Sequence, residues 1–124
     1  MSGIFDGGRA EQQRSFELHG LVVSLFRDGA AVRSDIPAKE GNSSFRFVDD
    51  YGVSVFYRAK DFIVRTSDLG DWRPKIGDKV HIGGKVYLVS VPNNEPCWRY
   101  RGNDEGQIRI HTKYMGPVEN VENQ

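Results

Sequence analysis

The sequence has a single cysteine, no excess of either charge and no long hydrophobic run. Cys97 alone cannot form an internal disulfide or an all-cysteine metal site. Lysine and arginine total 17, as do aspartate and glutamate, so the chain lacks the basic excess that proteins coating DNA normally carry. The longest apolar stretch, residues 20–26, is far too short to cross a bilayer. These absences exclude a disulfide scaffold and a membrane-spanning helix.

The two ends of the chain are polar. Residues 1–15 contain no apolar segment of the kind that secretory signal peptides have, so we expect synthesis and use on the cytosolic side of a cell. The 124 residues are enough for one domain with its own core. We therefore expect a flexible N-terminal segment at residues 1–15, a single β domain at 16–115 and a flexible tail at 116–124 that does not pack.

Valine, isoleucine, phenylalanine and tyrosine recur in short runs separated by turn residues, which is typical of many short strands. Tight two-residue turns are predicted at Asp28-Gly29 and Gly83-Gly84, because both pairs tolerate positive φ angles. Gly83-Gly84 joins the clearest strand pair, residues 79–91. Composition predicts loops at 37–44 and 67–74. The other predicted strands are residues 18–26, 31–36, 45–48, 53–58, 62–66, 97–101 and 107–112.

This pattern predicts an all-β protein: a small antiparallel β-barrel or sandwich of about seven or eight short strands with long loops. An alternative interpretation makes residues 9–25 a helix, since residues 10–14 are good helix formers. Val22, Val23 and the nearby Asp28-Gly29 turn favour a strand instead.

No group of residues predicts catalysis, a metal or a cofactor. The histidines lie singly on three different predicted strands, where a ligand set would have to converge. Cys97 has no histidine or aspartate at motif spacing, so a packed thiol is favoured over a nucleophile. Acidic pairs occur only where turns are predicted, which is an ordinary place for aspartate. The residues considered were His19, His81, His111, Asp49, Asp50, Asp68 and Asp71.

Basic and aromatic residues interleave in one predicted strand, Trp98-Arg99-Tyr100-Arg101. Stacking side chains beside cations are how oligonucleotide-binding barrels hold single strands. Strand alternation, however, places the two aromatic residues on one face and the two arginines on the other. The pattern therefore favours buried aromatic residues and exposed arginines, which could also face a protein partner.

Residues 57–91 resemble the head-tail joining proteins of tailed bacteriophages, also called head-closure, stopper or connector proteins. In that family a segment similar to residues 61–64 is followed along the chain by a short segment like Ser67-Asp68-Leu69. A proline then precedes a Gly-Asp pair, here Gly77-Asp78, and a strand pair like residues 79–91 follows. Residues 26–29 and 37–41 are similar to the family's opening hairpin and loop. The resemblance covers roughly residues 21–101.

The resemblance implies a non-enzymatic β-barrel protein of the virion neck, made in the host bacterial cytoplasm. Such a protein assembles as a ring, expected to be a hexamer, under the portal of the filled head. The ring closes the channel through which the genomic DNA passes and docks the tail. The implied partners are other copies of the chain, the portal and adaptor proteins of the head, and the tail terminator and tail tube proteins. No membrane is involved.

Composition and the resemblance together predict that partner contacts lie at residues 27–30, at the expected loop 37–44 and at both termini. The individual residues are Arg27, Asp28, Gly29, Lys39, Glu40 and Asn42. The alternative function is a small barrel that binds single-stranded nucleic acid through Trp98, Arg99 and Arg101.

Overall fold

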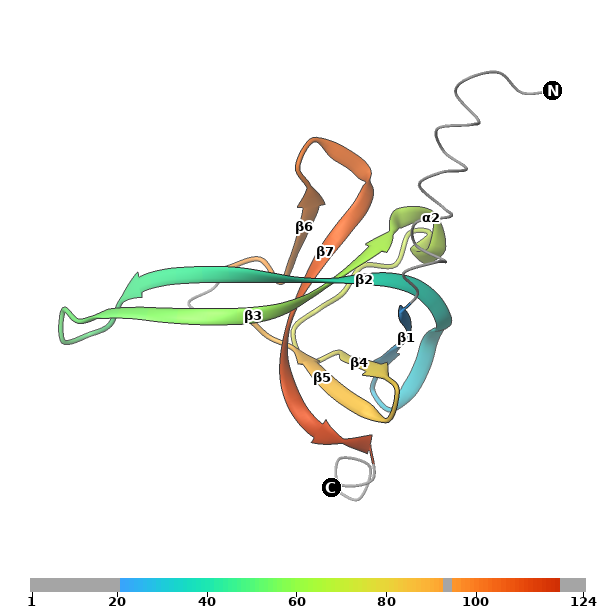
Figure 1. The fold of residues 1–124 in the computed structure, drawn as a ribbon, viewed down its shortest axis with the longest axis horizontal. Coiled ribbons are helices and arrows are strands. Elements are labelled where there is room, and N and C mark those ends of the chain that lie inside the picture. Colours follow the sequence, from blue (N-terminus) through green and yellow to red (C-terminus); the bar gives the residue numbers. More distant parts are fainter. Residues whose placement is uncertain (1–20, 93–94, 119–124) are drawn as a thin grey trace.

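The computed structural model describes residues 21–92 and 95–118, which form seven antiparallel strands and one short helix (Figure 1). The prediction of an all-β fold is confirmed. The elements are β1 (Leu21–Arg27), β2 (Ala30–Val48), β3 (Ser54–Arg65), α2 (Thr66–Leu69), β4 (Lys79–Ile82), β5 (Lys85–Val89), β6 (Trp98–Arg101) and β7 (Asp104–Pro117).

The sheet closes into a barrel. Its strand order is β3-β2-β1-β4-β5-β7-β6, and an additional pairing joins β3 to β7. Six strands therefore form a ring in which every strand has two neighbours, with β6 outside it on β7. The same edge of β7 pairs with β6 near its start and with β5 near its end. Closure removes most of the exposed strand edges that an open sheet would present.

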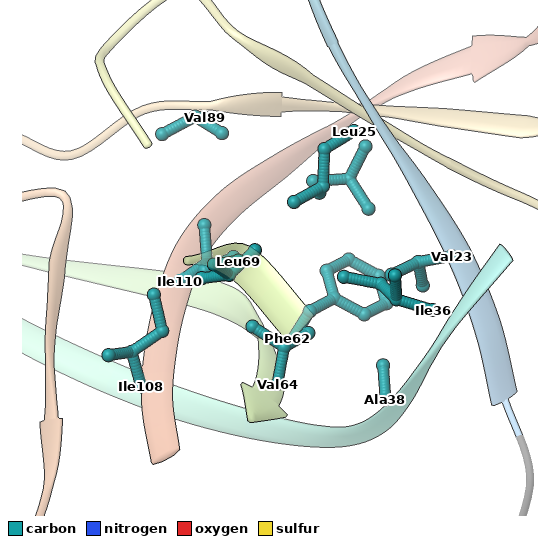
Figure 2. Packing of buried hydrophobic residues seen from close by; sticks show 11 residues of the cluster. Val23, Leu25, Ile36, Ala38, Phe62, Val64, Leu69, Val89, Ile108 and Ile110 are labelled. Atoms are coloured by element: carbon teal, nitrogen blue, oxygen red, sulfur yellow. The ribbon is translucent and has the colours of Figure 1, made fainter. Parts of the chain in front are cut away.

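The core lies inside this ring and comes from alternate residues of the strands (Figure 2). Phe62 and Val64 on β3 face Ile110 and Ile108 of β7, and all four are fully buried. Burial of one such side chain contributes about 1.5–3 kcal/mol. The rest of the buried cluster is Val23, Leu25, Ile36, Ala38, Leu69, Val80 and Val89.

Both predicted two-residue hairpins are confirmed. Asp28 and Gly29 join β1 to β2 with φ angles of 54° and 80°. Gly83 and Gly84 join β4 to β5 with φ angles of 51° and 83°. Positive φ at both turn positions is the type I′ geometry, whose twist matches that of the flanking strands. Local turn chemistry alone therefore specifies these two connections.

The predicted loop at residues 37–44 is wrong, because the segment lies inside the nineteen-residue strand β2. Pro37 and Ala38 pair with β1, while residues 38–48 pair with β3. Gly41 fits where β7 approaches closely, since a Cβ there would lie 3.3 Å from the Arg109 guanidinium. Ser43 is buried and bonds to a carboxylate of β3. Residue types that are common in loops are thus held in a strand here, by pairing with β1 at 37–38 and with β3 at 38–44.

Three other expectations need correction. Residues 53–58 and 62–66, predicted as two strands, belong to the single strand β3, apart from their outermost residues. Residues 67–74, predicted as a loop without helix, begin inside α2, whose single turn buries Leu69. Strand β7 runs to Pro117, two residues into the tail predicted at 116–124, because Gly116 and Pro117 pair with β5. The flexible ends predicted at 1–15 and beyond 118 lie outside the described residues.

Candidate protein-interaction surfaces

The feature that departs most from a plain barrel is a two-stranded arm formed by residues 43–59 of β2 and β3 (Figure 1). Within it the two strands pair only with each other, since β1 ends its pairing at Ala38 and β7 begins at Lys60. At about 3.3 Å per residue, the paired strands reach roughly 17–20 Å beyond the barrel. The arm therefore presents a long surface that the barrel leaves uncovered.

Large apolar side chains are exposed on the arm. Tyr51 is 91% exposed, Phe56 70%, Val48 62% and Val53 57%. The arm tip, residues 48–54, is closed by Asp49, whose carboxylate accepts hydrogen bonds from the backbone N–H groups of Tyr51 and Val53, both at 2.9 Å. Exposed apolar side chains gathered in one patch of a protein surface mark an interaction site. Composition and alternation along the sequence do not predict this surface, because it depends on the long pairing of β2 with β3.

A buried carboxylate fixes the base of the arm. Asp61 of β3 is fully buried, and its Oδ2 accepts hydrogen bonds from the Ser43 hydroxyl and from Arg109 Nη1, the latter at 2.8 Å. Its Oδ1 lies 2.8 Å from Nδ1 of His111, which is 1% exposed. Phe45 packs against the His111 ring at 5.1 Å in an edge-to-face arrangement. We call Ser43, Asp61, Arg109 and His111 the Asp61 cluster; it joins β2, β3 and β7.

The Asp61 cluster holds a charged carboxylate. Burial by itself raises the pKa of Asp61, but the hydrogen bonds from His111, Ser43 and Arg109 outweigh burial and lower that pKa below its ordinary value. An ionised carboxylate only accepts hydrogen bonds, so His111 carries a proton on Nδ1. Asp61 is therefore ionised at neutral pH and is bound from two neighbouring strands.

The residue types of the Asp61 cluster match a serine-histidine-aspartate triad, but its connections do not. In a triad the serine hydroxyl gives its proton to the histidine, and the aspartate binds the other side of the ring. Here Ser43 and His111 both bind Asp61. The described hydrogen bonds do not pair the serine with the histidine, so this geometry does not activate a nucleophile. The arrangement is suited to fixing three strands together.

Arg27, the first predicted contact residue, is already engaged within the chain. Its guanidinium donates two hydrogen bonds to the Asp78 carboxylate, at 2.9 and 2.7 Å, and one to the Arg73 carbonyl at 2.8 Å. It also lies 4.8 Å from the centre of the Trp72 ring. Asp28 and Gly29 are exposed at the tip of the β1–β2 hairpin. Arg27 thus ties the segment after α2 to the barrel, and only the turn beside it faces outward.

Lys39, Glu40 and Asn42 lie in the paired strand β2 rather than on a loop; Lys39 is half-buried, and Glu40 and Asn42 are exposed. Glu40 forms a partly exposed ion pair with Lys60 across the ladder, with an N–O distance of 3.2 Å. The Asn42 carbonyl accepts a hydrogen bond of 3.2 Å from Arg109, and its side chain is exposed. Residues 37–44, expected to offer partner contacts from a loop, are therefore already held in a paired strand.

The exposure of the side chains on strand β6 follows the predicted pattern of buried aromatic residues and exposed arginines only in part. Trp98 is half-buried and packs against the core, and Arg99 and Arg101 are exposed. Tyr100 is 39% exposed and lies edge-on to Trp98, with ring centres 5.4 Å apart. Arg101 donates a 2.9 Å hydrogen bond to Gln107. The surface is cationic, but Trp98 is not free to stack on a nucleic-acid base.

The described residues 21–92 and 95–118 contain no group of three histidine, cysteine, aspartate or glutamate side chains that could hold a metal ion. Cys97 is half-buried near the Pro74 carbonyl, and burial raises the pKa of its thiol. A raised pKa leaves the thiol protonated and unreactive at neutral pH. Within the described segments, no helix is both long and apolar enough to span a membrane.

Comparison with known proteins identifies one family. The sequence model of the family described as phage head-tail joining protein matches residues 2–119. This match covers nearly the whole chain and includes every strand of the barrel and the arm. A comparison with curated proteins found no match.

Proposed function

Because the chain belongs to the phage head-tail joining protein family, we propose that it forms a ring in the neck of the virion, under the portal. The family places the chain in a structural role at the junction of head and tail, in contact with components of both. In our proposal six copies form the ring, the ring closes the DNA channel of the filled head, and its lower face docks the tail. The genomic DNA passes through the ring, and the chain is made in the bacterial cytoplasm.

The observation that carries the proposal is the arm with its exposed apolar side chains. A closed ring needs two different surfaces on each copy that fit each other. A barrel with an arm on one side provides such an asymmetric shape, and the arm's apolar residues supply the kind of area that interfaces bury. A chain with equal numbers of acidic and basic residues is compatible with work done by protein contact.

The predicted contact residues fall into two groups in this proposal. Asp28 and Gly29 lie on an exposed turn, and Lys39, Glu40 and Asn42 lie in β2 near the arm base, where Glu40 and Asn42 are exposed and Lys39 is half-buried. We propose both groups as contact sites for neighbouring proteins of the neck. Arg27 contributes indirectly, by fixing the segment behind the turn.

Electron microscopy of particles made with the gene disrupted tests the proposal. The expected result is DNA-filled or emptied heads lying apart from complete free tails, with joined particles restored when the intact gene is supplied. A population of normal joined particles without the gene product would refute the joining role. Fluorescence anisotropy of labelled single-stranded DNA then tests the alternative, since salt-sensitive binding at sub-micromolar protein indicates a nucleic-acid module.

A further inference from the structure

The charges at the arm tip are all of one sign. Between Phe47 and Val55 the only charged residues are Asp49 and Asp50. Asp49 closes the turn through its hydrogen bonds, while Asp50 is exposed beside Tyr51. The tip therefore combines an acidic group with the most exposed aromatic side chain of the described chain.

Strand β6 carries the opposite combination. Its only charged residues are Arg99 and Arg101, and both are exposed although each has a partner in its own chain: Arg99 lies 3.5 Å from the Ser43 hydroxyl and Arg101 bonds to Gln107. Tyr100 between them is 39% exposed. In the described part of the chain β6 pairs with β7 alone, so its outer edge keeps unpaired backbone donors and acceptors. Such an edge accepts another strand or a turn readily.

Strand β6 reaches the base of the arm through Arg99 and Ser43, but the arm tip lies away from β6 within one copy. Figure 1 shows the arm and the β6–β7 hairpin leaving the barrel in different directions. Any contact between the arm tip and β6 must therefore join two copies, and it would be head-to-tail, because each copy uses a different surface.

We propose that the arm tip of one copy docks across the unpaired edge of strand β6 of the next. Asp50 then faces Arg99 and Arg101 on one face of the strand, and Tyr51 and Val53 reach over the edge to Tyr100 on the other. This inference rests on the ring of the proposed function and names the contact that closes it. Exposed apolar residues on the tip supply buried area, and the opposite charges select the partner surface and its orientation. A head-to-tail contact of this kind repeats around a ring when the rotation closes.

Cross-linking between singly labelled copies tests the contact. In a Cys97→Ala background, one chain carries Tyr51→Cys and a second carries Arg101→Cys. A short bis-maleimide is added to each alone and to the mixture, over a range of protein concentrations and in assembled particles. The expected result is a cross-linked dimer at least about fivefold more abundant in the mixture. Tyr51→Cys mixed with Asp71→Cys is the matched control, since Asp71 is exposed but lies outside both surfaces.

Charge reversal tests the specificity. Asp50→Arg and Arg101→Asp are each expected to weaken ring assembly about tenfold, since each places like charges together. The double variant is expected to recover assembly to within about threefold of the parent. Asp71→Arg and Lys85→Asp reverse exposed charges elsewhere and should leave assembly unchanged. Sedimentation velocity measures the oligomer, and unfolding curves confirm that every variant is folded.

The outcomes separate this contact from the proposed function. Rings that form without the Tyr51-to-residue-101 cross-link, and that tolerate both reversals, overturn the contact while the ring stands. Cross-links from the tip to a head or tail protein, in place of a second copy, also overturn it. Failure to find rings, free or in particles, removes the ring from the proposed function together with this contact. Salt-sensitive DNA binding that Arg101→Asp abolishes would assign β6 to nucleic acid instead.

Discussion

Substitution of Asp61 by asparagine is the sharpest test of how the base of the arm is held. Asparagine keeps the side-chain volume but removes the charge that accepts hydrogen bonds from Ser43, Arg109 and His111. Hydrogen bonds to charged groups contribute about 1.5–3 kcal/mol each, and they are not additive. Breaking a buried ion pair by removing one partner typically costs about 3–5 kcal/mol. Because Arg109 keeps partial access to water, we expect a loss near the lower limit, about 3 kcal/mol.

Urea unfolding followed by tryptophan fluorescence at neutral pH measures this loss. A decrease of about 3 kcal/mol in the free energy of unfolding corresponds to a melting temperature lower by roughly 12 °C. Asp71→Asn, at an exposed position, is the matched control and should change stability by less than about 0.5 kcal/mol. If Asp61→Asn were as stable as that control, the reasoning that a desolvated carboxylate clamps three strands would be refuted.

The pH dependence of stability gives an independent check. The pKa of Asp61 is lower in the folded chain than in the unfolded chain, so the unfolded state binds the proton more tightly. The contribution of Asp61 is therefore complete above its ordinary pKa of 3.8 and is lost as the pH falls through the folded pKa. The parent chain should lose stability steeply in this acid range, and Asp61→Asn less steeply. Parallel curves for the two chains would contradict the assignment.

Three further substitutions test the core, the loop anchor and the arm, with unfolding curves as the common measurement. Phe62→Ala should lower the free energy of unfolding by about 3–5 kcal/mol, because the ring is fully buried; a loss below 1 kcal/mol would contradict this. Arg27→Ala should lower the free energy of unfolding by about 3 kcal/mol, because the buried Asp78 carboxylate loses its counter-charge. Arg27→Lys should recover less than half of that loss, since lysine cannot make the two parallel hydrogen bonds of the guanidinium. Phe56→Ser should change stability by less than about 0.5 kcal/mol but reduce self-association in sedimentation; unchanged association would remove Phe56 from the interface.

The sequence predicts those parts of the fold that depend on neighbouring residues. Asp28-Gly29 and Gly83-Gly84 specify their turns because the required φ angles are a property of the two residues themselves. Alternation in residues 79–91 then divides the side chains of β4 and β5 between two faces, and Val80, Tyr87 and Val89 share the face toward the core. The all-β class follows from repeating such units along the chain.

The parts that could not be predicted depend on residues distant in the sequence. Residues 37–44 contain proline, glycine, asparagine and serine, yet β1 and β3 pair with them from positions 14 to 26 residues away. Lys60 and Asp61 look like a break between two strands, but Ser43 of β2 and Arg109 of β7 donate hydrogen bonds to the Asp61 carboxylate within a continuous β3. The close approach of Arg109 to Gly41, which leaves little room for a side chain at position 41, is visible only in the folded structure. Propensity measures local preference, and tertiary pairing overrides it here.

The Asp61 cluster lies at the base of the arm, and exposed apolar residues lie at its tip. A two-stranded ribbon without neighbours is marginally stable and bends easily, so its direction depends on how its base is fixed. The cluster fixes that base with directional hydrogen bonds between β2, β3 and β7, where apolar contacts would permit sliding. An arm held in one direction loses less conformational entropy when its tip binds, which favours assembly. Buried charge at the base therefore explains how exposed apolar residues about 20 Å away can present a defined surface to a neighbour.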